Sequence, residues 1–260
     1  MNFGICSLSS IPVRLEPSEK SEMITQILFG EHFSIMQLFM GWCQIELAFD
    51  KTIGWVDPRM ITPISARTFK QIDTKKAAVS TSILDLIRGT DEQLMVVAGS
   101  SLPLWRPYKK EFSLGQAFYA VSGEYTAKFT NNLSQFLIQR ALRYFNVPHQ
   151  AGGRSPFGID SSGFIQIIFK MAMIQLPRSI EEQAKIGETI TFIEECENGD
   201  IAFFQDENGV INHAGFIWER NKIIHVQGKV QIDGIDQYGI YDIMTRRYSH
   251  NLRLIKRIRY

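Results

Sequence analysis

The first 65 residues alternate short apolar runs with turn-forming residues. The runs are MITQILFGEHFSIMQLF, WCQIELAF and TIGWV, and glycines at positions 30, 41 and 54 interrupt them. Short strands separated by regularly spaced turn residues are typical of small all-β barrels. The pattern therefore predicts a small β-barrel module over residues 1–65.

The pattern over residues 66–130 is less regular. The segment AAVSTSILDLI fits either a strand or a helix, whereas MVVAGSSLPLW and FSLGQAFYAVSGEY are typical of strands around a loop. We interpret this stretch as a second small β module.

The pattern changes at Asn131. Over residues 131–260, two helical segments come first and strand-like runs follow. NNLSQFLIQRALRYF predicts an amphipathic helix with Asn131 or Asn132 as its N-cap, ended by Val147-Pro148. SSGFIQIIFKMAMI predicts a second helix that is apolar on most sides and hence buried. Helices followed by a block of strand-like runs favour an α+β domain with an antiparallel sheet. These runs cover residues 200–205, 213–219, 222–227 and 252–258.

The charge balance and the metal-binding residue types narrow the function. Lys and Arg number 28 against 27 Asp and Glu, a net charge of +1, so the chain has no excess charge to bind nucleic acid. Three widely separated cysteines fit neither a disulfide framework nor a metal site. The five histidines contain no HxxxH pair. We therefore expect no metal and no cofactor.

The N-terminus shows no targeting signal. It lacks a basic start followed by an unbroken apolar run, and no segment approaches the roughly 20 apolar residues that span a membrane. We expect a soluble, cytoplasmic protein without a membrane span. A chain whose leader had been removed would show the same pattern.

The candidate chemistry lies at a helix start and on two strands. His213 and His225 lie on neighbouring runs, and a turn at 219–221 would pair these runs as a hairpin. Asp160 and Ser161 precede the buried helix, where backbone N–H groups favour negative charge. A nucleophile there, facing two histidines, is the arrangement of a papain-like hydrolase. Spacing alone also fits ordinary half-buried histidines and a simple N-cap.

Several motifs in one order resemble a known family. GGRSPFGIDSSGFIQ, GDIAFF, NHAGF and IIHVQGKVQIDGID resemble the NlpC/P60 domain over residues 130–260. VRLEPSEKSEMITQILFGE and GWCQIELAFDKTIGWV resemble the first bacterial SH3-like module of its γ-D-glutamyl-L-diamino-acid endopeptidase subgroup, which includes dipeptidyl-peptidase VI. The resemblance implies a multidomain protein, with one or two N-terminal SH3-like β-barrel modules followed by an α+β papain-like NlpC/P60 domain.

The resemblance also assigns roles to three residues. Ser161 holds the place of the nucleophilic cysteine, His213 that of the base, and His225 that of the residue that orients the base. A cysteine works there because its thiol, with a pKa of about 8.5, is readily ionised beside an imidazolium. A hydroxyl is a much weaker acid and needs concerted deprotonation. We therefore expect abolished or greatly weakened turnover.

Other family positions have changed as well. His149 and Ala151 replace the aromatic residues of a Tyr-x-Trp-Gly-Gly run that lines the substrate pocket in the family. Ser179 replaces the aspartate of a Pro-Arg-Asp run, and Thr52-Ile53 replace a common tyrosine before Gly-Trp. Several changes around one pocket favour natural divergence over a single engineered Cys→Ser change.

Some groups for binding a peptide remain. Asp160 and Ser162 keep the places that, in the subgroup, recognise the free amine of an L-Ala-γ-D-Glu peptide, and Glu31 is the candidate acid from the SH3-like module. The structural alternative for Asp160 is that its carboxylate fixes the loop. The structural alternative for Glu31 is that it is a solvated turn residue. Our leading hypothesis is an inactive or impaired homologue that binds a peptidoglycan stem-peptide fragment. The rivals are an active endopeptidase, by a serine nucleophile or as an engineered Cys→Ser variant, and a scaffold or interaction module.

Overall fold

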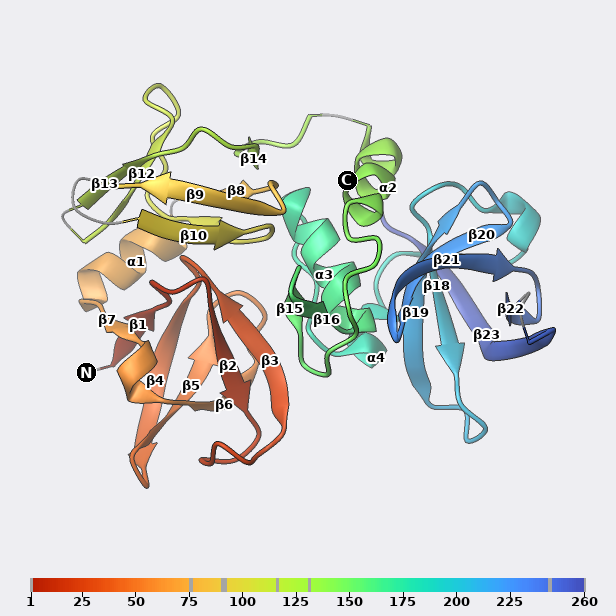
Figure 1. The fold of residues 1–260 in the computed structure, drawn as a ribbon, viewed down its shortest axis with the longest axis horizontal. Coiled ribbons are helices and arrows are strands. Elements are labelled where there is room, and N and C mark those ends of the chain that lie inside the picture. The colour runs from red at the N-terminus through yellow and green to blue at the C-terminus, as the bar shows by residue number, and fades with distance from the viewer. Residues whose placement is uncertain are drawn as a thin grey trace. The chain divides into compact units, whose positions relative to one another are not determined.

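The fold comes from a computed structural model that describes residues 2–74, 77–89, 93–115, 117–130, 132–242 and 245–259. The chain forms two compact units (Figure 1). Unit 1 contains Met1–Phe129 and Ala151–Pro156, and unit 2 contains Thr130–Gln150 and Phe157–Tyr260. No helix among the described residues is long and apolar enough to cross a membrane.

The N-terminal part of unit 1 is a seven-stranded antiparallel sheet in the order β3-β2-β6-β5-β4-β1-β7. Side chains alternate between buried and half-buried along β2 and β5, as the period of a strand requires. The inward set forms one core of mostly aliphatic residues and confirms the predicted first β module. Its elements are β1 (Phe3–Ile5), β2 (Ser10–Arg14), β3 (Met23–Leu28), β4 (His32–Phe39), β5 (Trp42–Leu47), β6 (Ile53–Val56), the 3-10 helix η1 (Pro58–Met60) and β7 (Thr62–Pro63).

The second part of unit 1 begins with helix α1 (Ala66–Thr74), which the sequence pattern did not predict, and continues with short strands. AAVSTSILDLI, which fitted a strand or a helix, forms strands β8 and β9. Phe29 packs into the core of this part together with Phe112 and Tyr119, so the two β modules share apolar contacts. The strands are β8 (Ala78–Ser80), β9 (Leu84–Arg88), β10 (Gln93–Val97), β11 (Ser101–Leu102), β12 (Glu111–Leu114), β13 (Ala117–Ala120) and β14 (Tyr125–Thr126).

A short segment from later in the chain completes unit 1. It carries strand β15 (Arg154–Ser155), and the Arg154 side chain is fully buried. Its guanidinium donates to both carboxylate oxygens of Glu31, at 3.0 Å each, and to the carbonyl of Gln26 at 2.7 Å. The Gln26 side chain accepts from the Arg154 backbone N–H at 2.8 Å. This two-point ion pair holds the segment in unit 1.

Unit 2 places its helices next to a sheet. Helix α3 packs against strands β19 and β20 and against α2 (Figure 1). Asn132 caps α2 by accepting from the Gln135 N–H at 3.0 Å, whereas the alternative cap Asn131 lies outside the described residues. Nearly every residue of α3 is buried, as predicted. The helices are α2 (Leu133–Leu142), α3 (Ser161–Met171), α4 (Ile180–Gln183) and the 3-10 helix η2 (Ile193–Glu195).

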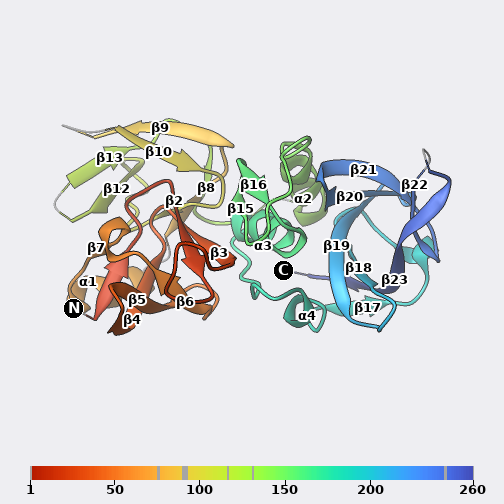
Figure 2. The ribbon, with the colours of Figure 1, turned by 60° about the horizontal axis from the view of Figure 1, so that its bottom comes forward.

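The sheet of unit 2 is antiparallel, in the order β17-β23-β18-β19-β20-β21-β22. This confirms the α+β prediction. Strand β22 also pairs with β23, so the strands from β18 to β23 close into a ring, which the view in Figure 2 shows. The strands of this sheet are β17 (Glu188–Ile190), β18 (Ile201–Gln205), β19 (Ile211–Trp218), β20 (Lys222–Gln227), β21 (Lys229–Ile235), β22 (Gly239–Asp242) and β23 (Arg247–Arg257), and unit 2 also contains β16 (Gly158–Ile159) outside this sheet.

Replacing Glu31 with Gln is expected to lower the free energy of unfolding by about 3–5 kcal/mol, because it leaves the buried Arg154 charge without its carboxylate. Glu46→Gln is the matched control: Glu46 meets Lys51 at 3.7 Å on the surface, where an ion pair contributes about 1 kcal/mol or less. Urea denaturation of both variants measures the difference. Equal losses in the two variants would contradict a stabilising role for the buried pair.

Candidate active site

Ser161 is the first residue of helix α3 and follows its N-cap, Asp160. The Asp160 carboxylate accepts from the Gly163 N–H at 2.7 Å. The first N–H groups of a helix lack intrahelical partners and carry a partial positive charge. An oxyanion that forms at Ser161 would therefore meet favourable backbone dipoles.

Ser161 begins a chain of hydrogen bonds through two imidazoles. Its Oγ lies 2.9 Å from Nδ1 of His213, and Nε2 of His213 lies 2.9 Å from Nδ1 of His225. Nε2 of His225 lies 2.8 Å from Oδ2 of Asp233, which also accepts from the Gln231 side chain at 2.6 Å. Four side chains thus form one continuous relay.

The carboxylate of Asp233 determines the direction of every bond in this relay. An ionised carboxylate can only accept, and the hydrogen bond from His225 lowers the pKa of Asp233. His225 therefore donates from Nε2 and accepts at Nδ1 from the Nε2–H of His213. Nδ1 of His213 is left as an acceptor facing the Ser161 hydroxyl, which is the arrangement a general base requires.

The predicted hairpin brings the two imidazoles together. Strands β19 and β20 pair antiparallel across the predicted turn, with Gly215 opposite His225. His213 lies two residues before Gly215 and so shares its face, on the diagonal to His225. A Cβ on Gly215 would lie 2.7 Å from the Cβ of His225. The glycine is therefore needed for the His225 ring to lie against this strand.

His250, from strand β23, stacks on His213 with ring centroids 4.0 Å apart and planes 24° from parallel. Burial, followed by the nearby His250 and His225, holds the pKa of His213 well below its ordinary value. Burial also lowers the pKa of His250 to about 4. Both rings are therefore neutral at pH 7, and His213 is available as a base.

A second polar cluster flanks Ser161. Arg178 donates to Oδ2 of Asp160 at 2.5 Å and to the Ser162 hydroxyl. The Ser162 hydroxyl in turn donates to Oδ1 of Asp160 at 3.2 Å. Asp160 thus has the loop-fixing contacts expected of a structural residue. Its predicted role in binding a peptide amine stays a prediction.

The other predicted pocket residues lie in different surroundings. His149 is exposed, and its backbone N–H donates to the carbonyl of Gly228 at 2.8 Å. Ser179 is exposed at the N-cap position of α4 and makes no capping hydrogen bond with its side chain. Ala151 is exposed in unit 1. Their predicted roles in lining the pocket stay predictions.

Glu31 is not the solvated turn residue that was the alternative for it. Its side chain is buried in unit 1, accepts from the Leu28 N–H at 2.7 Å and pairs with Arg154.

Among the described residues, no group of three or more His, Cys, Asp or Glu side chains could hold a metal ion. Cys6, Cys43 and Cys196 are buried free thiols.

Comparison with known proteins identifies the domain around this relay. Residues 146–249 match the NlpC/P60 family. The chain carries an NlpC/P60 domain. Residues 13–59 match the bacterial dipeptidyl-peptidase SH3 domain. The architecture is thus an N-terminal SH3 domain with a β-barrel followed by an α+β NlpC/P60 domain.

The curated relatives include dipeptidyl-peptidases, probable endopeptidases and a γ-DL-glutamyl hydrolase. The chain is 29% identical to the γ-D-glutamyl-L-lysine dipeptidyl-peptidase of Bacillus subtilis over 120 residues, which is 45% of this chain and 40% of that enzyme. It is 24% identical to dipeptidyl-peptidase 6 of Lysinibacillus sphaericus over 73% of this chain and 76% of the relative. This chain thus spans well under two thirds of the Bacillus subtilis enzyme.

A solved structure shows the same fold over nearly the whole length. An NlpC/P60 family protein from Bacillus cereus superposes with a TM-score of 0.83 at 17% identity, covering 98% of this chain and 99% of the other. At this identity the likeness shows the fold alone.

Three residues of the site were missed from the sequence. Asp233 had a usable signal: a tight turn at Gly228 pairs His225 with Gln231, and the residue two further on then shares the face of His225. Arg178 lay in the Pro-Arg-Ser run but was given no partner. His250 had no local signal, because only the pairing of β23 brings it onto His213.

Replacing His250 with Phe is expected to reduce the loss of stability in acid. The pKa of His250 falls from its ordinary 6.5 in the unfolded chain to about 4 in the folded protein. Within that window the unfolded chain binds the extra proton, so the free energy of unfolding decreases as the pH falls from 6.5 toward 4. Phe keeps a flat ring on His213 and removes the proton-binding site.

Urea denaturation at about pH 7.5 and about pH 4.5 measures this change in the native chain and in the variant. His149→Phe is the control, because it removes an exposed histidine of the same domain. An equal acid-induced loss in the native chain and in His250→Phe would rule out the predicted contribution of His250.

Proposed function

We propose that this chain is an NlpC/P60 peptidase homologue of severely reduced activity, which binds a peptidoglycan stem peptide of the L-Ala-γ-D-Glu-diamino-acid class. One observation carries the proposal. The relay behind Ser161 is complete, with each hydrogen bond between 2.8 and 2.9 Å, while the nucleophile is a hydroxyl. The similarity to a γ-D-glutamyl-L-lysine dipeptidyl-peptidase supports this class of peptide.

The chemistry that this relay can perform is general-base catalysis. When Ser161 attacks a peptide carbonyl, its proton passes to Nδ1 of His213, which becomes an imidazolium. His225 accepts a hydrogen bond from that imidazolium and donates one to Asp233, so the carboxylate stabilises the positive charge through one intervening ring. The backbone N–H groups at the start of α3 face the developing oxyanion.

The same environment makes the proton transfer costly for a hydroxyl. Burial lowers the pKa of His213 because it disfavours the imidazolium. A thiolate would offset this cost, because it can form before attack and pair with the imidazolium. A serine hydroxyl cannot be held as the anion at neutral pH, so it gains no such pair. The base is therefore in place but weak for this nucleophile.

Polar groups beside Ser161 support binding of a charged peptide end. Arg178 carries a fork of N–H donors, and Asp160 and Ser162 offer oxygen acceptors within the same cluster. The proposal puts the free amine of the L-Ala residue at Asp160. That amine would share the carboxylate with Arg178.

Replacing Ser161 with Cys is expected to raise kcat/KM on L-Ala-γ-D-Glu-diamino-acid peptides by at least about 100-fold, because the thiolate–imidazolium pair becomes available. The measurement is release of the L-Ala-γ-D-Glu dipeptide, followed by liquid chromatography. Ser162→Cys is the matched control. It places a thiol in the same loop, at a side chain that hydrogen-bonds Asp160 and Arg178 instead of His213, and it should give no increase.

Calorimetric titration of the same peptide tests the binding half of the proposal. The native chain and Ser161→Ala are expected to bind it with dissociation constants within about twofold of each other, since the nucleophile contributes little to ground-state binding. Native turnover within about tenfold of Ser161→Cys would make the chain an active serine variant. Absence of binding, together with an inactive Ser161→Cys, would instead favour a scaffold or interaction module.

A further inference from the structure

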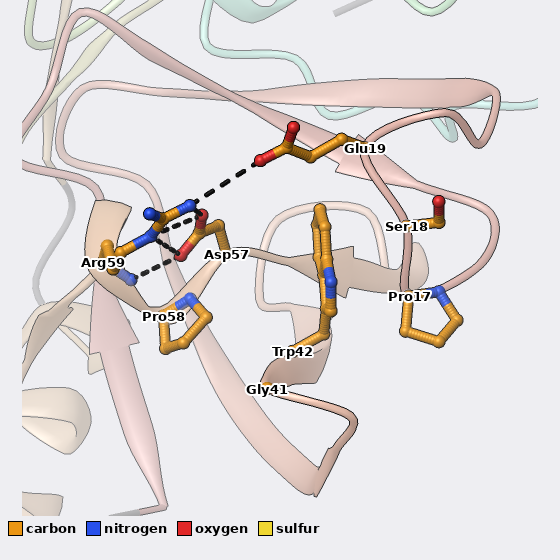
Figure 3. Close-up of a pocket in the computed structure, with 8 residues that line it drawn as sticks. All are labelled: Pro17, Ser18, Glu19, Gly41, Trp42, Asp57, Pro58 and Arg59. Carbon is orange, nitrogen blue, oxygen red and sulfur yellow. Dashed lines mark hydrogen bonds and ion pairs between the residues drawn. The ribbon is translucent and has the colours of Figure 1, made fainter.

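A cavity of about 400 Å³ lies beside Trp42 in the SH3 domain (Figure 3), but its polar side chains are either paired already or open to solvent. The buried carboxylate of Asp57 accepts from the backbone N–H, Nε and Nη2 of Arg59. The side chains of Arg59 and Glu19 are 79% and 78% exposed. Among its lining residues, the cavity therefore presents no buried polar side chain that lacks a partner.

Two turns of unit 2 carry the same three residues, Glu-Asn-Gly. They are residues 197–199, between η2 and β18, and residues 207–209, between β18 and β19. An asparagine followed by glycine can react with its own backbone, because glycine has no Cβ to keep its nitrogen away from the asparagine side chain. The two copies therefore place one reactive sequence in two different tertiary settings.

The reaction replaces the side-chain amide of the asparagine. The backbone nitrogen of the glycine loses its proton and attacks Cγ of the asparagine, a new C–N bond forms, and the side-chain nitrogen leaves as ammonia. The resulting cyclic imide takes up a water molecule and opens at either carbonyl, which gives aspartate or isoaspartate. One water is consumed for each ammonia released, and the step needs no oxidant or reductant.

The first copy is held by other segments of the fold. Oδ1 of Asn198 accepts from the Glu219 N–H at 2.7 Å, and the Asn198 backbone carbonyl accepts from the Ser134 hydroxyl. The Gly199 N–H donates to the Ile217 carbonyl at 3.0 Å, and Gly199 is buried. The attacking nitrogen and the amide that it would attack are thus each tied to the strand β19 or to the turn that follows it.

The second copy has no such ties. Asn208 and Gly209 are both exposed in the turn that joins β18 to β19. Asn208 uses its backbone N–H in a bond to Oδ1 of Asp206 at 2.9 Å, and among the described residues its side chain makes no hydrogen bond. The Gly209 N–H donates to the Asp206 carbonyl at 3.1 Å, within the same turn.

These contacts give the two copies different barriers to the reaction. Attack at the first copy has to break the Glu219 bond and to separate the buried Gly199 from β19, whereas attack at the second copy breaks only a bond within one exposed turn. Breaking one or two additional hydrogen bonds slows a reaction by about tenfold or more. We propose that Asn208 is a modification site at which the folded protein deamidates spontaneously, at least about tenfold faster than at Asn198.

Deamidation at Asn208 changes the turn that leads into β19, the strand of His213. Oδ1 of Asp206 accepts from the N–H groups of Asn208 and Val210, at 2.9 and 3.0 Å. Isoaspartate routes the main chain through Cβ, which adds a backbone atom between these two N–H groups. Either product also adds a carboxylate beside those of Asp206 and Glu207, and like charges repel. The modified turn is therefore held less firmly than the original.

The test follows the full native chain by mass spectrometry during storage at neutral pH. Digestion after glutamate releases residues 198–207 and 208–219 as separate peptides, and the mass of each reports the exchange of the amide NH2 for OH. Fragment spectra distinguish Asn208 from Asn212 within the second peptide. The folded chain is expected to lose the Asn208 amide at least about tenfold faster than the Asn198 amide. The reaction uses neither Ser161 nor a bound peptide, so the result is independent of the proposed function.

The same chain kept unfolded in urea is the matched control. Both copies then present Glu-Asn-Gly without the fold, so Asn198 and Asn208 are expected to react at similar rates. Asn208→Gln is a second control, and its peptide 208–219 should keep its mass. The proposal is overturned if Asn208 in the folded chain reacts no faster than Asn198. It is also overturned if Asn208 stays intact during storage several times longer than the unfolded chain needs to react.

Discussion

The candidate active site of this protein depends on one hydrogen-bond acceptor, Asp233. Asp233 can only receive hydrogen bonds, and its contact with His225 determines the tautomer of both imidazoles in the relay. The lone pair on Nδ1 of His213 then faces the Ser161 hydroxyl. The relay runs through side chains from α3, β19, β20 and β21. The closed sheet therefore holds three of these elements, β19, β20 and β21, in fixed hydrogen-bonding register with one another.

The hydroxyl of Ser161 changes what this geometry can achieve. Burial and the stacked His250 keep His213 neutral, which suits a base but opposes the imidazolium that must form during attack. A thiol nucleophile supplies a compensating anion beforehand, and a hydroxyl does not. The relay can thus receive a proton, whereas the hydroxyl beside it is a much weaker acid than a thiol. By the family resemblance, His149 and Ala151 stand where the family has aromatic pocket residues, and their role on the substrate side stays a prediction.

A buried ion pair holds the chain shortly before Ser161. Arg154 is fully buried and would be strongly unfavourable there without the two carboxylate contacts from Glu31. Because of this pair, the segment 151–156 belongs to unit 1, although the residues on both sides of it belong to unit 2. Glu31 therefore acts in this structure as the partner of a loop residue. Within unit 1, the SH3 domain thus holds the segment 151–156 through this ion pair.

The sequence by itself determined the local elements, because periodicity and capping act over a few residues. An asparagine cap at the start of α2, the buried helix that begins at Ser161 and the hairpin that joins His213 to His225 were all readable in this way. The tertiary structure alone decided the closure of the sheet, the stacking of His250 on His213 and the pairing of Glu31 with Arg154. Each of these contacts joins segments far apart in the chain, and their partners depend on strand pairing and on burial of charge, which no local pattern encodes.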